Sequence, residues 1–192
     1  MDEKETRRMK AAIIVPTLNA GVTWKDWINA LLATGIRVHD IYVVDSGSTD
    51  NTIQLASEAE FNVRQIKSGT FNHGGTRQEA VTNLAGYDIV VFLTQDAILL
   101  DAKSIRHILF PFESDQVGAV CGRQLPRQNA GAIEAHARLF NYPEASSINS
   151  INDASEKGLK VAFLSNSFAA YRVAALNEVG GFPEDVIFGE DM

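Results

Sequence analysis

The apolar run Ile89–Leu93 limits the fold of this chain more than any other feature of its sequence. Five consecutive apolar residues, with no polar residue among them, suit a strand that is covered on both faces, as in the middle of a parallel sheet. Similar runs occur at residues 11–15 and 41–44, and segments with helical spacing lie between the runs. This alternation predicts βαβ units, and therefore an α/β fold with a mostly parallel central sheet flanked by helices.

Periodicity and turn residues define the expected elements. Strands are expected at residues 11–15, 41–44, 61–66, 89–93, 117–121 and 161–164. Helices are expected at residues 24–32, 52–59, 74–84, 102–110 and 173–179. Residues 123–160 are polar and show no clear period, which predicts an irregular insertion that faces the substrate.

Composition limits the number of domains and the kind of partner. The chain has 192 residues, 45% of them hydrophobic, which can bury one sizeable core but hardly two. Residues 1–10 form a charged tail without the apolar segment of a signal peptide, and residues 11–192 form the expected domain. No apolar run approaches the roughly 20 residues that span a bilayer, so we expect a cytoplasmic protein. The net charge of -7 argues against a general affinity for nucleic acid.

Three of the expected strands end in polar segments, at residues 16–19, 45–50 and 94–96. Because the carboxyl ends of parallel strands meet at one edge of a sheet, we expect these segments to gather around one ligand. A fourth segment, residues 71–77, places two glycines before a helix, where backbone N–H groups can approach an anion. The sequence therefore predicts a nucleotide site at this edge. The alternative is that the acids at the strand ends only cap turns.

The order of these segments resembles that of the family 2 glycosyltransferases, inverting enzymes of the GT-A fold, which is Rossmann-like and binds nucleotides. In that family a Pro-Thr-x-Asn segment is followed by an Asp-x-Gly-Ser-x-Asp segment, an acidic motif of the DXD type and a late Glu-Asp pair. The last element is Glu190-Asp191 here, so the resemblance covers essentially the whole chain after the tail. It implies a hexosyltransferase that uses a nucleotide sugar.

The resemblance also implies roles for particular residues. Thr17 and Asp45 would contact the pyrimidine, and Asp96 would bind the Mg²⁺ or Mn²⁺ that bridges the diphosphate oxygens. Asp191 would be the base that deprotonates the acceptor hydroxyl, with Glu190 orienting the acceptor, or the two roles are exchanged. The residues implied to bind the nucleotide sugar are Pro16, Thr17, Asn19, Asp45, Gly47, Ser48, His73, Gly74, Arg77, Gln95 and Asp96.

Two segments indicate the donor sugar. Residues 73–77 resemble the His-Gly-x-x-Arg segment of bacterial rhamnosyltransferases, and residues 94–97, with one carboxylate, resemble their variant acidic motif. The resemblance implies dTDP-L-rhamnose as donor, polysaccharide biosynthesis, and a glycan or lipid-linked acceptor that brings the protein to the inner face of the membrane. A family member that uses a UDP-sugar and a non-catalytic module that binds nucleotide sugars remain as alternatives.

The chain ends at Met192, one residue after the expected base. Members of the family continue into helices that cover the site. We therefore expect either a chain truncated at its C-terminus or a reduced form of the enzyme, in which donor binding survives better than turnover.

Overall fold

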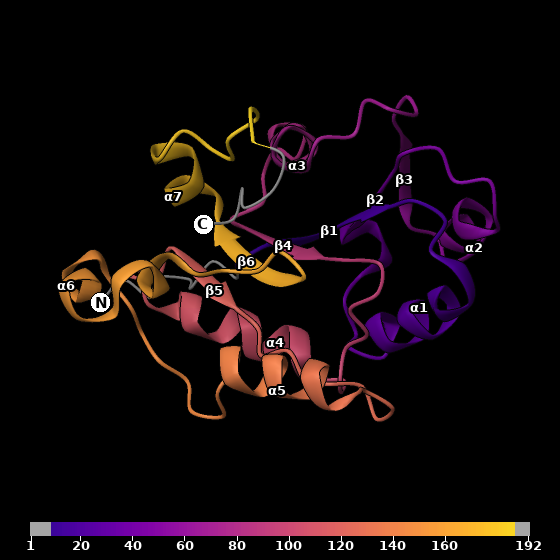
Figure 1. The fold of residues 1–192 in the computed structure, drawn as a ribbon. Coiled ribbons are helices and arrows are strands. Elements are labelled where there is room, and N and C mark those ends of the chain that lie inside the picture. The colour runs from indigo at the N-terminus through magenta and orange to yellow at the C-terminus, as the bar shows by residue number, and fades with distance from the viewer. Residues whose placement is uncertain (1–8, 187–192) are drawn as a thin grey trace, which may run out of the picture.

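Six strands form one mixed sheet at the centre of the computed structural model, which describes residues 9–186 (Figure 1). The strands are β1 (Ala11–Thr17), β2 (Ile41–Asp45), β3 (Asn62–Gln65), β4 (Ile89–Leu93), β5 (Ala119–Cys121) and β6 (Phe168–Arg172). Their order across the sheet is β3-β2-β1-β4-β6-β5. Strand β6 runs antiparallel to both of its neighbours, and the other neighbouring pairs are parallel. The predicted α/β class with a mostly parallel sheet is confirmed.

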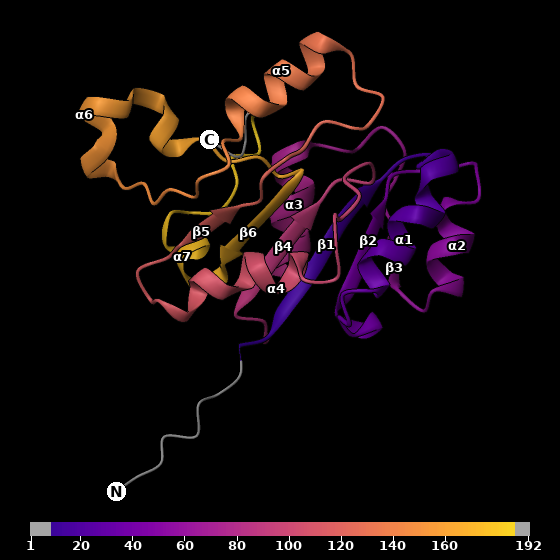
Figure 2. The same ribbon diagram turned by 90° about the horizontal axis from the view of Figure 1, so that it is seen from below.

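Helices cover both faces of the sheet (Figure 1). They are α1 (Trp24–Leu32), α2 (Thr52–Glu58), α3 (His73–Thr82), α4 (Ser104–Leu109), α5 (Ala132–Asn141), α6 (Ala154–Lys157) and α7 (Val173–Glu178). Helices α1, α2 and α4 pack on one face, whereas α3 and α7 pack on the other. Helices α5 and α6 bury none of their residues and lie apart from the sheet, as Figure 2 shows.

Strand β4 occupies the centre of the core, as its sequence predicts. All five of its side chains are 0% exposed. Successive side chains of a strand point to opposite faces, so Val91 packs with the cluster around α1 and α4, and Val90 and Phe92 pack with the cluster around α3 and α7. An uninterrupted apolar run is therefore the pattern required at this position.

The predicted strand at residues 161–164 is wrong, because residues 158–162 form a 3-10 helix and the strand is β6 at Phe168–Arg172. Two alanines at the middle of β6 have little intrinsic preference for strands, which concealed it in the sequence. Ala169 and Ala170 are nevertheless 0% exposed, since β6 lies between β4 and β5. Strand assignment here depends on tertiary packing.

The prediction that residues 123–160 are irregular is also wrong in part, because α5 and α6 lie within them. Helix α5 is amphipathic, but its apolar side chains Ile133, Leu139 and Phe140 are 87%, 52% and 67% exposed. Within residues 9–186 this apolar stripe belongs to neither core cluster, although the Lys160 ammonium lies 5.5 Å from the centre of the Phe140 ring. The surrounding polar residues masked its helical period in the sequence. The segment lies at the edge of the sheet where β1, β2 and β4 end (Figure 2).

The strand order places a topological switch point between β1 and β4. The chain passes from β1 to β2 and β3 on one side, and then returns to place β4 on the other side of β1. Ligands of open α/β sheets bind at the carboxyl ends of the strands, at such a switch point. Because β6 is antiparallel, its beginning lies at this same edge, and the Thr94 N–H donates to the Ser167 carbonyl at 3.2 Å.

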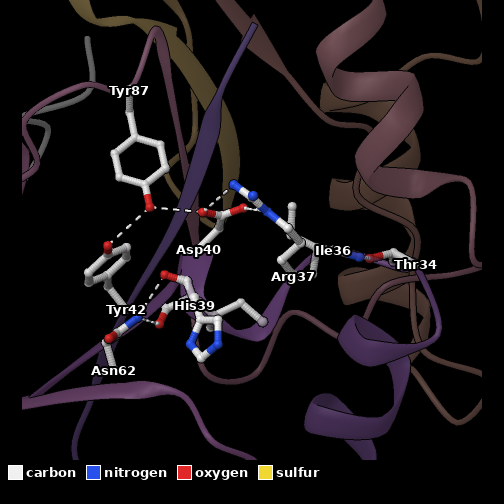
Figure 3. Close-up of polar contacts among 9 residues, drawn as sticks. Thr34, Ile36, Arg37, His39, Asp40, Tyr42, Asn62 and Tyr87 are labelled. Atoms are coloured by element: carbon white, nitrogen blue, oxygen red, sulfur yellow. Dashed lines mark hydrogen bonds and ion pairs between the residues drawn. The ribbon is translucent and has the colours of Figure 1, made fainter. Parts of the chain in front are cut away.

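The opposite edge of the sheet is closed by a polar network (Figure 3). Asp40, which immediately precedes β2 and is 6% exposed, accepts two hydrogen bonds from the Arg37 guanidinium and one from the Tyr87 hydroxyl at 2.9 Å. The Tyr87 hydroxyl also lies 3.1 Å from that of Tyr42. Burial, together with these two neighbours, raises the pKa of Tyr87 above its ordinary value. The network therefore fastens the segment before β4 to the beginning of β2.

Replacing Tyr87 by Phe should lower the free energy of unfolding by about 1–3 kcal/mol, because it removes a hydrogen bond to a buried carboxylate. Urea denaturation at neutral pH measures this change. Tyr42→Phe is the matched control, since it removes only the contact between the two hydroxyls and should have a smaller effect. Equal stability of Tyr87→Phe and the unaltered protein would show that the network does not contribute.

Candidate functional site

Thr17 and Asp45 lie side by side at the carboxyl edge of the sheet. They are paired in the register of β1 and β2, and they are 3% and 0% exposed. Pro16 and Val44 form the preceding pair. The Ser46 N–H and hydroxyl both donate to the Thr17 carbonyl at 2.9 Å, so the parallel pairing continues one residue past β2. The structure thus brings the first two predicted segments into direct contact.

The Asp45 carboxylate is the centre of this edge. It accepts hydrogen bonds from the Thr17 hydroxyl at 2.9 Å, the Gly47 N–H at 2.9 Å, and the N–H and hydroxyl of Ser48. A carboxylate offers about four lone-pair positions, so the two oxygens are fully used by the chain itself. Burial alone would raise the pKa of Asp45, but these donors outweigh it and the pKa lies below its ordinary value. Asp45 is therefore held as an anion within the frame of the site.

Gly47 is required by the turn that wraps around Asp45. Its φ of +108° lies in the region that favours glycine, and a Cβ at this position would lie 3.2 Å from the Cβ of Ser68. The turn directs the N–H groups of Gly47 and Ser48 back onto the same carboxylate oxygen. The predicted site residues Gly47 and Ser48 thus shape the loop after β2.

The loop after β1 is fastened to the loop after β2 by side chains. The Asn19 N–H donates to the Ser48 hydroxyl at 2.8 Å, and the Asn19 side chain accepts from the Thr49 N–H at 2.8 Å. Asn19 has a φ of +47°, a conformation that Asn tolerates better than most residues. Further along, the Gly21 N–H donates to Asp50 at 3.1 Å. The motif residues therefore hold two loops in one conformation.

Gln95 joins the same loop to the end of β4. Its side-chain oxygen accepts from the Leu18 N–H at 2.8 Å, and its side-chain nitrogen donates to the Leu18 carbonyl at 3.1 Å. Of the predicted site residues, Thr17, Asn19, Asp45, Gly47, Ser48 and Gln95 consequently belong to one framework of hydrogen bonds that crosses β2, β1 and β4.

Asp96 differs from these residues because its carboxylate points into solvent. The side chain is 68% exposed, and its nearest described cation is the Arg127 guanidinium, 3.9 Å from a carboxylate oxygen. Arg127 also approaches the Asp96 carbonyl at 3.4 Å. Sequence reasoning missed Arg127, which belongs to the segment predicted to be irregular and carries no motif that marks it. The contact sets one positive charge beside the exposed acid.

The beginning of α3 holds His73, Gly74 and Arg77. The Arg77 guanidinium is buried, donates to the His73 carbonyl at 3.0 Å and lies 5.8 Å from the centre of the Phe92 ring. It approaches Nδ1 of His73 at 3.3 Å. The two glycines lie in the first turn of α3 and not before it, and the expectation of free N–H groups is wrong for Gly75, whose N–H donates to the side chain of the capping residue, Asn72, at 2.7 Å.

Two stacked tryptophans of α1 donate hydrogen bonds to the segments that follow β2 and β4. Trp24 and Trp27, predicted as core residues of the first helix, are 0% and 1% exposed, and their ring centres are 4.6 Å apart. Their indole N–H groups donate to the carbonyls of Thr52 and Thr94, each at 3.0 Å. The first carbonyl belongs to the start of α2 and the second follows β4. These hydrogen bonds were not predicted, because the sequence does not show which loops pack against α1.

Some predictions fall on residues that the structure does not describe. Glu190 and Asp191, the expected acceptor-binding and catalytic residues, lie outside residues 9–186, as does most of the expected tail at residues 1–10. Within the described part of the chain, no group of three or more His, Cys, Asp or Glu side chains is placed to hold a metal ion. None of the helices described there has the length and apolar character needed to cross a membrane.

Comparison with known proteins decides the family. Residues 12–180 match the family model of glycosyl transferase family 2. The chain belongs to this family. The chain is 44% identical over 185 residues to RfbN, an O-antigen chain rhamnosyltransferase of Salmonella typhimurium, and 45% identical over 181 residues to WbaN, an O-antigen chain rhamnosyltransferase of Salmonella anatum. These matches cover 96% and 94% of the chain but only 59% and 58% of the two relatives.

Solved structures confirm the GT-A fold. TarS of S. aureus in complex with UDP-GlcNAc matches with a TM-score of 0.67 at 20% identity, over 95% of this chain and 51% of TarS. The mannosyltransferase PcManGT of Pyrobaculum calidifontis, in complex with GDP-Man and Mn²⁺, matches with a TM-score of 0.64 at 20% identity. That match covers 94% of this chain and 49% of the mannosyltransferase.

The lowered pKa of Asp45 predicts how stability depends on pH. The charged form stabilises the folded state at pH values above 3.8, the ordinary pKa of the group, and this contribution is lost as pH falls through the lower folded value. Asp45→Asn, which lacks the charge, should reduce the free energy of unfolding by about 1–3 kcal/mol at neutral pH. Urea denaturation should show that the deficit shrinks in acid. A deficit that is the same at every pH would contradict this assignment, and the exposed Asp115→Asn is the control.

Proposed function

We propose that this chain binds a nucleotide sugar at the carboxyl edge between β1 and β4 and transfers the sugar to an acceptor hydroxyl with inversion. The observation that carries the proposal is the framework around Asp45, which joins the ends of three strands at the switch point beside the exposed carboxylate of Asp96. Two relatives named as rhamnosyltransferases, and neighbours in complex with GDP-Man and UDP-GlcNAc, support it.

In this proposal the nucleobase binds beside Thr17 and Asp45. Uracil and thymine share an imide N–H, which would replace one of the donors that Asp45 accepts now. The strand pairing and the loop hydrogen bonds described above fix the backbone around this part of the site, and they involve Pro16, Asn19, Gly47 and Ser48. His73, Gly74 and Arg77 would face the phosphates and the sugar. The preformed framework orients the donor before the reaction.

The residues present fit a divalent cation that is held by one protein carboxylate. Asp96 is exposed at the edge of the sheet, and Mg²⁺ commonly takes one or two carboxylates while substrate phosphates supply further oxygens. Such a cation, Mg²⁺ or Mn²⁺, would stabilise the negative charge of the departing diphosphate. Arg127 would add a second positive charge on the same side of the nucleotide, because its guanidinium already lies beside Asp96.

Inversion requires a base on the side of the sugar opposite the diphosphate. We assign this role to Asp191, with Glu190 orienting the acceptor, or the two roles exchanged, because the pair resembles the late Glu-Asp element of the family. A carboxylate within hydrogen-bond reach of the acceptor hydroxyl takes its proton as the bond to the anomeric carbon forms and the bond to the diphosphate breaks.

The donor and acceptor proposed are dTDP-rhamnose and an O-antigen glycan. The names of RfbN and WbaN, at 44% and 45% identity, support rhamnose as the sugar and an O-antigen glycan as the acceptor. The dTDP carrier rests on the resemblance of residues 73–77 and 94–97 to bacterial rhamnosyltransferases. The chain spans less than two thirds of either relative, so both substrates are proposals for this chain. A lipid-linked acceptor would bring the protein to the inner face of the membrane from the cytoplasm, where we place it.

Calorimetric titration with dTDP or UDP tests the site. We expect binding to be tighter with Mn²⁺ or Mg²⁺ than with EDTA, and Asp96→Ala should abolish this difference while leaving the metal-free affinity nearly unchanged. Asp115→Ala, another exposed acid, is the matched control because it lies in the turn before β5, at the opposite edge of the sheet from the proposed site. Equal affinities of the unaltered protein in metal and in EDTA would remove Asp96 from the proposed role.

Thermal unfolding with a panel of nucleotide sugars tests the donor. dTDP-rhamnose should stabilise the protein more than UDP-glucose, UDP-N-acetylglucosamine or GDP-mannose, and a ligand at 100 times its dissociation constant adds about 2.7 kcal/mol. Stronger stabilisation by a UDP-sugar would overturn the choice of rhamnose and leave the family membership unaffected. Nucleotide-sugar binding without transfer to any acceptor glycan would favour a non-catalytic module.

A further inference from the structure

Gln95 makes an unusual pair of hydrogen bonds with the backbone of one residue. Its amide oxygen accepts from the Leu18 N–H at 2.8 Å, and its amide nitrogen donates to the Leu18 carbonyl at 3.1 Å. The partners fix the orientation of the amide, because a backbone N–H can only donate and a carbonyl can only accept. The Gln95 amide therefore accepts from the N–H and donates to the carbonyl of one residue, as the backbone of a neighbouring β-strand does.

An amide is the side-chain group that this pairing requires. A carboxylate of the same length could accept from the Leu18 N–H, but it has no proton to donate to the Leu18 carbonyl. Two oxygens would then face one another at hydrogen-bond distance. The pair uses one lone pair of the amide oxygen and one of the two amide protons, so the orientation of the Gln95 amide is set by the Leu18 backbone without any ligand.

The position of the pair gives it a consequence for the site. Leu18 follows Thr17, the last residue of β1, and Gln95 precedes Asp96 after the end of β4. The two strands are neighbours at the switch point of the sheet. The pair therefore sets the separation between Thr17, on the proposed base side, and Asp96, on the proposed diphosphate side. The Thr94 carbonyl next to Gln95 is held in turn by the Trp27 indole.

We propose that Gln95 is a positioning residue that holds the base side and the diphosphate side of the nucleotide site at a fixed separation, and that it is not a ligand of the metal ion or the nucleotide. This inference rests on the proposed function of the site. It assigns to Gln95 a role different from the direct contact that the family resemblance implies.

Two substitutions separate positioning from ligation. Gln95→Glu keeps the length and one acceptor but loses the donor, and Gln95→Leu loses both bonds. The matched control for the added charge is Gln116→Glu, an exposed position that precedes β5 at the opposite edge of the sheet. Each variant is titrated calorimetrically with dTDP and with Mn²⁺, well below its unfolding temperature, so that a loss of stability alone does not change the result.

Positioning predicts that both Gln95 variants bind dTDP about 10-fold more weakly, in EDTA as well as in Mn²⁺, with no gain in affinity for Mn²⁺ in Gln95→Glu. Tighter Mn²⁺ binding by Gln95→Glu, or a loss seen only with metal, would identify Gln95 as a metal ligand and overturn the proposal. Unchanged dTDP affinity in both variants would also overturn it.

Hydrogen exchange at the Leu18 amide separates failure of this inference from failure of the proposed function. Exchange should be faster in Gln95→Leu than in the unaltered protein, whether or not a nucleotide is present. If the unaltered protein binds no nucleotide, the proposed function fails and the positioning role fails with it. Faster exchange at Leu18 in Gln95→Leu would then show only that the two hydrogen bonds between Gln95 and Leu18 exist. If the protein binds dTDP and exchange at Leu18 is unchanged in Gln95→Leu, Gln95 does not hold the Leu18 amide and only this inference fails.

Discussion

The carboxyl edge of the sheet depends on the hydrogen bonds that the buried carboxylate of Asp45 accepts. An uncompensated charge at a fully buried position would be strongly destabilising, so the surrounding loops must supply donors to it. Thr17 supplies one from β1, and the turn at Gly47 and Ser48 supplies the others. Satisfying this one group thus fixes the end of β1, the end of β2 and the turn between β2 and α2. The loop after β1 then attaches to that turn through Asn19.

The hydrophobic core reaches the same loops through Trp24 and Trp27. Each indole is buried against the sheet and each needs a partner for its N–H, since a buried donor without one is costly. The partners are the carbonyls of Thr52 and Thr94, which lie on either side of the loop after β1. The packing of α1 therefore determines where the loops after β2 and β4 lie. Core stability and the shape of the site are coupled through two hydrogen bonds.

How much could be predicted from the sequence depended on the origin of each signal. Strand β4 and helix α1 were found because burial on both faces, or on one stripe, leaves a direct pattern in the residues. The network around Asp45 could be located but not resolved, since a sequence shows that polar groups share an edge without showing which of them bond to one another. Strand β6 and Arg127 were missed because small residues in a strand and a single exposed cation leave no pattern. The proposed chemistry comes from the family resemblance, which names residues but does not separate those that contact the ligand from those that position others.

Many motif residues at this edge have structural partners in the chain itself, which changes how the motif should be understood. Asn19, Asp45, Ser48 and Gln95 bond to backbone or to one another, whereas the carboxylate of Asp96 remains exposed. A site that holds a donor accurately needs such supports, because a small displacement of a loop weakens every contact made in the transition state. The amino edge shows the contrast: Arg37, Tyr87 and Asp40 satisfy one another there and close the sheet. The two edges differ because the carboxylate of Asp40 is buried within its network, whereas the carboxylate of Asp96 is 68% exposed and is the group that we propose meets the metal ion and the diphosphate.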